Sequence, residues 1–188
     1  LDYCMPTSRG QGRANPAPAT AQDMRILSSA HLAGDGSTEL SELEFGLIVA
    51  GNAFGRWVVR CMAAAGVPDL TLTDVLVLHH VHHRGRPKKL ADVCFTLNYE
   101  DSHVVNYALK KLVGAGLLRG DKQGKEVFYA TTPAGVALVG RYRDVRERCL
   151  LPAAPREGDE RAELARIAQR LRELSGVYDQ AARAAASL

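Results

Sequence analysis

The apolar positions along the chain repeat at intervals that predict a mainly helical protein. Residues 38–65 carry apolar side chains at helical spacing, and Gly66-Val67-Pro68 is expected to end this long first helix. Three shorter helices are expected to follow in close succession, over about 73–84, 88–97 and 101–115. Asp101 stands where a helix of this kind takes its N-cap residue.

The segment after these helices has the pattern of strands. Residues 117–119 and 127–131 are largely apolar and flank 120–125, which combines glycines with two lysines. Two short apolar runs around such a segment predict a β-hairpin with a basic tip. Thr132-Pro133 then predicts the start of another helix, reaching about Leu151, because proline is favoured at the first helical position.

The C-terminal part predicts one more helix, beyond Pro152 and Pro155, with a single apolar seam among Arg and Glu residues. The seam residues recur every three or four positions and are Leu164, Ile167, Leu171, Leu174 and Tyr178. The other end of the chain, residues 1–22, is rich in Gly, Pro, Ala, Gln and Asn and is expected to be a disordered arm.

Composition narrows the choice of function. The length of 188 residues suits one globular domain with a helical extension, and no apolar run approaches the roughly 20 residues of a membrane span. Four cysteines without CxxC spacing indicate free thiols in a reducing cytoplasm, and no secretory leader is recognisable. The net charge is +3, but residues 84–126 alone hold nine Lys and Arg against five acids. This concentration of positive charge favours a nucleic-acid partner.

Four histidines near the end of the second helix suggest an alternative. His79 and His83 are four residues apart, a spacing that can hold Zn²⁺ or Ni²⁺ on one helix face. No matching Cys, Asp or Glu set stands nearby, and the helix dipole alone favours His at a helix C-terminus. A surface or structural role and a metal-sensing role both stay open.

The sequence offers little support for catalysis. Residues 120–125 superficially resemble a phosphate-binding loop, but no Ser or Thr follows the lysine and the segment lies between strands rather than before a helix. No nucleophile elbow, HExxH motif or dinucleotide fingerprint occurs. We therefore expect a binding protein without cofactor, with protein docking as a further alternative to DNA binding.

Three helices followed by a hairpin with a basic tip is the order of a winged helix-turn-helix unit. The chain resembles the MarR family of bacterial transcription regulators over about residues 40–150. The runs that carry this resemblance are 72–78, the helix and glycines at 101–118, and Ala130-Thr131-Thr132-Pro133-Ala134-Gly135 after the hairpin. The resemblance implies a mainly α fold with a small β-hairpin wing and a helical dimerisation region. It also implies a cytoplasmic, nucleoid-associated homodimer that binds a palindromic operator.

The resemblance assigns regions and residues to these roles. The expected regions are a dimerisation helix at 38–68, a DNA-binding domain at 70–133 and C-terminal dimerisation helices at 134–188. Base contacts are expected from Ser102, His103, Asn106 and Tyr107, because the third helix of the unit enters the major groove. Phosphate contacts are expected from Lys110, Lys111, Arg119, Lys122, Gln123 and Lys125. The dimer interface is expected to include Leu43, Leu47 and the C-terminal seam. A merely solvated helix face is the alternative for Asn106 and the lysines.

Family members similar to this chain place a small-molecule effector between the dimerisation helices and the DNA-binding unit. The corresponding candidates are Arg56, Trp57 and Arg60, with a role in the core or the dimer interface as the alternative for Trp57. A thiol switch at Cys61 or Cys94 is a further alternative, although a buried Cys is usually structural.

Overall fold

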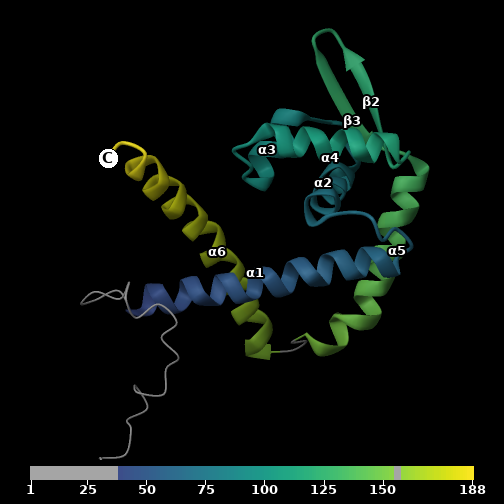
Figure 1. Cartoon of the computed structure of the whole chain (residues 1–188). Helices are drawn as coiled ribbons and strands as arrows, with labels where there is room; N and C mark the ends of the chain where they lie inside the picture. The colour runs from purple at the N-terminus through teal and green to yellow at the C-terminus, as the bar shows by residue number, and fades with distance from the viewer. Residues whose placement is uncertain (1–37, 155–157) are drawn as a thin grey trace, which may run out of the picture. The chain divides into compact units, whose positions relative to one another are not determined.

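The computed structural model describes residues 38–154 and 158–188, so the expected arm at 1–22 lies outside the described residues. The chain divides after Asn52 into two units, which are taken separately here. The described part of the first unit is the N-terminal half of α1 (Thr38–Ala64), the long helix in Figure 1. Leu43 and Ile48 lie on this half with more than a third of their surface exposed.

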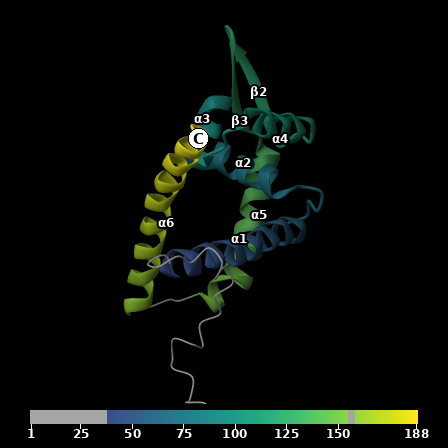
Figure 2. The ribbon, with the colours of Figure 1, turned by 60° about the vertical axis from the view of Figure 1, so that its left-hand side comes forward.

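The second unit contains the remaining elements and confirms the expected mainly α chain with a small hairpin. In order they are α2 (Leu72–His82), η1 (His83–Gly85), β1 (Lys88–Lys89), α3 (Leu90–Leu97), α4 (Ser102–Gly114), β2 (Leu118–Gln123), β3 (Glu126–Thr131), α5 (Pro133–Cys149), η2 (Leu151–Ala153) and α6 (Gly158–Ala185). Figure 2 shows the β2–β3 hairpin projecting beyond α2, α3 and α4. Among the described helices, none combines the length and apolar character needed to cross a bilayer.

Side-chain caps determine where the central helices begin. The Thr71 hydroxyl accepts a hydrogen bond from the Asp74 N–H at 3.3 Å, and the Asp74 carboxylate accepts one from the Thr71 N–H at 2.8 Å. This capping box starts α2 at Leu72, one residue before the expected position. Asp101 caps α4 as expected, accepting from the His103 N–H at 2.8 Å. Thr132 caps α5, with Pro133 in the first turn.

The sheet has three strands rather than the two of a simple hairpin. The order is β1-β3-β2 with antiparallel pairing, and Lys88 and Lys89 lie opposite Tyr129 and Phe128. The expectation that a helix begins at Lys88 is therefore wrong. A two-residue strand has no alternation of its own and is formed only by pairing with β3, about 40 residues later. The hairpin strands also extend further than expected and leave only Gly124-Lys125 between them.

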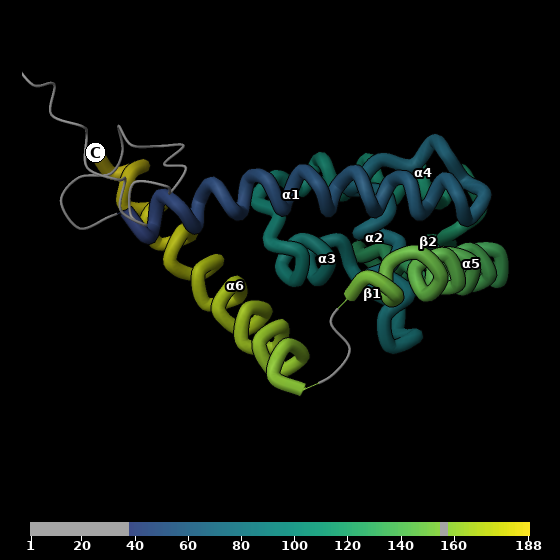
Figure 3. Tube along the Cα trace, turned by 90° about the horizontal axis from the view of Figure 1, so that it is seen from below, coloured from purple at the N-terminus to yellow at the C-terminus, as the bar shows by residue number. Residues whose placement is uncertain are grey.

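The core of the second unit lies between α2, α4, α5 and the C-terminal half of α1. Its largest fully buried side chains include Met62, Leu78, Leu109, Leu112, Leu118 and Leu138. A fully buried Leu contributes about 1.5–3 kcal/mol, so α4 is held mainly by its apolar face. By contrast, none of the described residues of α6 is buried. Figure 3 shows α6 as a helix distinct from α5.

Candidate nucleic-acid interface

Helix α4 has one buried face and one exposed face. Val105, Ala108, Leu109 and Leu112 are buried to at least 99% and recur at three- and four-residue spacing. Ser102, His103 and Lys110 are exposed, and Tyr107 is exposed to 72%. The polar residues therefore point away from the core, as the sequence predicts for a helix that reads the edges of bases.

Asn106 occupies a different environment from its neighbours on α4. It is half-buried and lines a groove of about 380 Å³ between α4, the start of α3 and the hairpin. Lys89, Lys125 and Tyr129 line the same groove. The four expected base-contacting residues thus fall into two groups, with Asn106 beside the hairpin and Ser102, His103 and Tyr107 on the open surface.

Lys111 is held within the domain. Its Nζ lies 2.6 Å from Oδ2 of Asp74, whose side chain is 3% exposed, and donates to the Asp69 carbonyl at 2.8 Å. Two of its three N–H donors are thereby used to join α4 to α2. The expected phosphate contact at Lys111 does not fit this geometry, because a buried carboxylate already neutralises its charge. Lys110, one residue earlier, is exposed and keeps the expected orientation.

The hairpin carries the other expected phosphate contacts, and all of them are exposed: Arg119, Lys122, Gln123 and Lys125. Side chains alternate along a strand, so Arg119 and Gln123 lie on one face of β2 and Lys122 on the other. The Arg119 guanidinium pairs with Asp121 on its own face, with Nε and Oδ2 3.1 Å apart. Within the part of the chain that the structure describes, Lys122 and Lys125 form no ion pair with a carboxylate, so their charges face the solvent.

Lys89 lies beside the hairpin in the groove that contains Asn106, although it was not among the expected phosphate contacts. Its Nζ lies 2.6 Å from Oε2 of Glu126 and 5.2 Å from the ring centre of Phe128. The hydrogen bond that the Lys89 ammonium donates to the Glu126 carboxylate raises the pKa of Lys89. The two adjacent lysines, Lys88 and Lys89, are visible in the sequence as a basic pair. Their place beside the hairpin follows only from the pairing of β1 with β3, which the sequence does not show.

A separate cavity of about 490 Å³ lies between the C-terminal half of α1, α2 and α5. Its lining is mostly apolar, with Phe54, Trp57, Leu76, Val139 and Leu150, and its polar residues are His79, Tyr142, Arg143 and Arg146. Of the three expected effector residues, only Trp57 lines this cavity. Most of the other lining residues come from α2 and α5. Their spacing in the sequence predicts helix faces, but it does not show that these faces leave a space between them.

His79 and Tyr142 form the polar floor of this cavity. Their ring centres are 4.5 Å apart in an edge-to-face arrangement. Burial lowers the pKa of His79, with a smaller effect from the charge of His82. Burial, together with Cys61, raises the pKa of Tyr142 to about 12. Both rings are therefore uncharged near neutral pH, which suits an aromatic ligand with its charge directed toward Arg143 or Arg146.

The structure separates the two histidines of the metal alternative. His79 lines the cavity beside Trp57, whereas His83 begins η1 and lines another cavity. Helix α2 ends at His82, so the four-residue spacing does not place the two rings together. Within residues 38–154 and 158–188, no group of three or more His, Cys, Asp or Glu side chains is placed to hold a metal ion.

Of the two cysteines of the thiol alternative, Cys61 is buried and Cys94 is half-buried. Cys61 is 1% exposed, and its thiol donates to the Tyr142 carbonyl at 3.5 Å. Burial raises the pKa of Cys61 and that of Cys94. Because the thiolate is the reactive form, a raised pKa favours structural roles for both.

The expected dimer residues lie on α1 and α6, and they are exposed or half-buried. Leu43 and Leu47 are on α1, and Leu164, Ile167 and Leu171 are each more than 40% exposed on α6. Leu174 and Tyr178 are half-buried further along α6. The residues of the seam share one face of a long helix, as predicted from their spacing.

Comparison with known proteins gives these features a context. Residues 70–135 match the family model of a winged helix DNA-binding domain, which spans α2 to the start of α5. No curated protein sequence matches the chain. The matched residues contain α2, α3, α4 and the β2–β3 hairpin, so this part of the chain is similar to a winged helix DNA-binding domain.

Solved structures share this fold at low sequence identity. AbfR of Staphylococcus epidermidis is 18% identical with a TM-score of 0.60, over 75% of this chain and 92% of AbfR. The structure of reduced AbfR bound to DNA is 17% identical in sequence with a TM-score of 0.56, over 72% of this chain and 92% of AbfR. A MarR transcriptional regulator from Methanosarcina mazei Go1 is 11% identical with a TM-score of 0.61, over 72% of this chain and 97% of that regulator. The resemblance expected from the sequence is confirmed as a shared fold.

Proposed function

We propose that this chain, which carries a winged helix DNA-binding domain in the fold of MarR-type regulators, is a transcription regulator. It binds a double-stranded operator with α4 in the major groove and the β2–β3 hairpin along the adjacent backbone. The observation that carries this proposal is the division of α4 into a buried apolar face and an exposed polar face beside a basic hairpin. A binding role without catalysis follows from the same domain.

The proposed contacts follow from exposure. Ser102, His103 and Tyr107 face the groove floor, and Asn106 reaches a base at the side next to the hairpin. An Asn can form two hydrogen bonds to an adenine, which are worth about 1–3 kcal/mol of discrimination. The proposed phosphate contacts are the exposed Lys110, Arg119, Lys122, Gln123 and Lys125, which set the register of the protein on the duplex. Lys111 is excluded because it pairs with Asp74.

A homodimer completes the proposal. The exposed apolar residues of α1 and α6 require a partner surface, and a second copy of the chain offers the same residues. Two copies of α4 would then read two half-sites about 34–36 Å apart, one helical turn of DNA. The proposed operator is accordingly a palindrome. Support comes from the shared fold with AbfR, which has been solved bound to DNA.

Selection of bound sequences from a random duplex library tests the proposal. The full chain is expected to enrich a palindromic motif with half-site centres about 10–10.5 base pairs apart. Asn106→Ala is expected to weaken binding to the selected duplex by about 1–3 kcal/mol and to relax the preference at one position in each half-site. Arg148→Ala, a loss of charge on the exposed end of α5, is the matched control and is expected to change neither. Failure of the wild-type chain to enrich any motif would contradict the proposal.

We further propose that the cavity beside Trp57 binds a small effector. Its apolar walls suit an aromatic or aliphatic body, and Arg143 and Arg146 suit a carboxylate. In Bordetella bronchiseptica BpsR, a protein of similar fold, 6-hydroxynicotinic acid regulates DNA binding. A ligand between α1, α2 and α5 would act by changing the spacing of two α4 helices in the dimer.

The single tryptophan of the chain reports on this cavity directly. Titration with benzoate or nicotinate is expected to change the fluorescence of Trp57 in a saturable way. Arg146→Gln is expected to weaken that binding, whereas Arg60→Gln, which removes an exposed charge that does not line the cavity, is expected to leave it unchanged. Equal effects of the two variants would contradict the assignment.

A further inference from the structure

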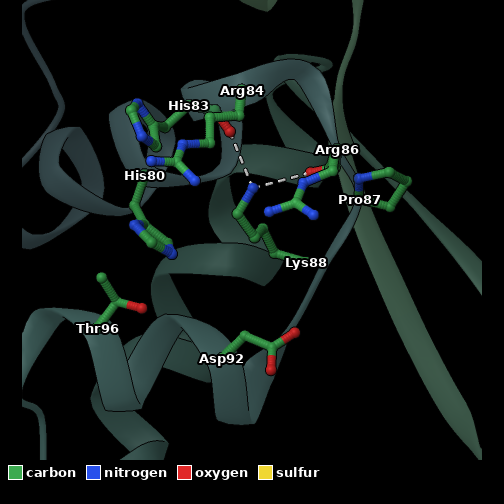
Figure 4. Close-up of a pocket in the computed structure, with 8 residues that line it drawn as sticks. All are labelled: His80, His83, Arg84, Arg86, Pro87, Lys88, Asp92 and Thr96. Carbon is green, nitrogen blue, oxygen red and sulfur yellow. Dashed lines mark hydrogen bonds between the residues drawn. The ribbon is translucent and has the colours of Figure 1, made fainter.

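A polar cavity of about 550 Å³, distinct from the apolar cavity beside Trp57, lies at the C-terminal end of α2 and is shown in Figure 4. His80 comes from α2, His83 and Arg84 from η1, Arg86 and Lys88 from the connection into β1, and Asp92 from α3. Five of these six side chains are basic. No residue of α4 or of the β2–β3 hairpin lines the cavity, so it is separate from the proposed base-reading surface.

The two lysines of β1 show how this separation arises. Successive side chains on a strand point to opposite faces. Lys89 turns to Glu126 and Phe128 on the hairpin side. Lys88 turns the other way, and its Nζ donates to the carbonyls of His83 at 2.9 Å and Arg86 at 3.0 Å. These two bonds, drawn in Figure 4, fix the ammonium at the cavity wall and leave one N–H for a ligand.

The positive charges around this cavity lack acidic partners. Within the described residues, no ion pair joins Arg84, Arg86 or Lys88 to a carboxylate. Asp92 is the one acid in the lining, and its carboxylate accepts the Lys89 N–H at 3.1 Å as part of the α3 cap. Burial and the charge of Arg86 lower the pKa of Lys88, the Asp92 carboxylate partly offsets this, and Arg84 lowers the pKa further, so the cations repel one another. A bound anion would relieve that repulsion.

The backbone and His80 give two further observations. Arg84 has φ 63° and ψ 12°, a left-handed conformation that is rare for residues other than Gly, Asn and Asp. Strain of this kind is concentrated at binding sites, where the surrounding structure holds it. The Nε2 atom of His80 is buried and has no hydrogen-bond partner among the described residues. The imidazole of His80 also lines the cavity.

We propose that this cavity binds a phosphate group, with Arg84, Arg86 and Lys88 supplying the charge and His80 a hydrogen bond. Two guanidinium groups and an ammonium favour a dianion, and guanidinium matches the geometry of phosphate oxygens in pairs. The volume of about 550 Å³ leaves room for a phosphate group carried by a larger molecule. Its source is either a phosphorylated small molecule or a backbone phosphate of DNA beyond the base-reading surface.

Calorimetric titration of the full chain with inorganic phosphate and with pyrophosphate, without DNA, tests the first source. The wild-type chain is expected to bind one ion per chain, and Arg84→Gln with Arg86→Gln is expected to weaken binding at least tenfold. Arg161→Gln with Arg172→Gln removes the same charge from the exposed surface of α6 and is expected to leave phosphate binding unchanged. Equal losses in both double variants would mean general charge attraction and would overturn the proposal.

Arg84→Gly separates charge from backbone strain. Glycine adopts the left-handed conformation without strain, so this variant is expected to keep the melting temperature of the wild type while losing affinity for pyrophosphate. A variant that melts as the wild type does and binds pyrophosphate equally well would show that Arg84 contributes nothing to a site.

Salt titration of duplex binding tests the second source, and this arm rests on the proposed DNA-binding function. If the phosphate belongs to DNA, the Arg84→Gln, Arg86→Gln variant is expected to show a slope of log affinity against log salt that is shallower by about 0.9 per lost contact. An unchanged slope together with no pyrophosphate binding would overturn the proposal. A wild-type chain that binds no duplex would contradict the DNA-binding function alone, since the pyrophosphate arm uses no DNA.

Discussion

Asp74 is a buried charged residue on which two helices depend. Its carboxylate closes the cap of α2 and pairs with Lys111 of α4. Asp74→Ala is expected to reduce the free energy of unfolding by about 2–4 kcal/mol, because it removes a helix cap and leaves Lys111 without its partner. Urea denaturation measures this change. Asp144→Ala, which removes an exposed carboxylate of α5, is expected to stay within about 0.5 kcal/mol, and equal effects of the two would contradict this role of Asp74.

His79 makes stability depend on pH. Burial lowers its pKa in the folded state below the ordinary value of 6.5, so above that value the residue is neutral in both states and contributes no pH dependence. Below 6.5 the unfolded chain binds the proton more readily, and stability is lost as the pH falls. His79→Gln is expected to flatten the curve of unfolding free energy against pH between about 6.5 and 5. An unchanged curve would show that His79 titrates normally.

Single residues also mark the limit of sequence reasoning. Lys110 and Lys111 look equivalent in the sequence, yet one is exposed and the other pairs with Asp74, 37 positions away. Exposure on a helix face follows from spacing, but an ion pair between helices depends on tertiary packing that spacing does not contain. The cavity lining also depends on tertiary packing, because it forms where α1, α2 and α5 meet, and of the three expected effector residues only Trp57 lies there.

At the scale of elements, Gly135 determines how α5 meets the hairpin. A Cβ at this position would lie 2.1 Å from the carbonyl oxygen of Leu117, whose backbone also accepts from the Thr132 N–H at 3.1 Å. Gly135→Ala is therefore expected to lower the free energy of unfolding by more than about 2 kcal/mol, since backbone has to move. Gly140→Ala, on the same helix with open space around it, is expected to stabilise by about 0.4–1 kcal/mol. Thermal unfolding of both variants compares them, and a stable Gly135→Ala would contradict the contact.

The elements themselves were largely predictable where a local signal exists. Caps at Asp101 and Thr132 and the apolar face of α4 are written in neighbouring residues, and the structure confirms them. Strand β1 was missed because it is formed by pairing with β3. The end of α2 at His82 was also missed, because the left-handed turn at Arg84 has no glycine signal until the next residue.

At the scale of the whole molecule, the proposal requires two copies of the chain. The seam of α6 is expected to lie in their interface, so Leu171→Glu introduces a charge there and is expected to convert a dimer into a monomer. Light scattering coupled to size-exclusion chromatography measures the mass. Ala165→Glu adds the same charge on the opposite side of α6 and is expected to leave the dimer intact. A wild-type chain of monomeric mass at micromolar concentration would contradict the dimer.

The most direct test of the account is duplex binding by the exposed face of α4. Fluorescence anisotropy compares the wild-type chain, a variant with Ser102, Asn106 and Tyr107 all replaced by Ala, and the control Arg148→Ala on the selected duplex. The account predicts that the triple variant falls to the affinity for random duplex, while its circular dichroism and that of the control match the wild type. A triple variant that still prefers the selected duplex as strongly as the wild type does would show that this face of α4 does not read DNA.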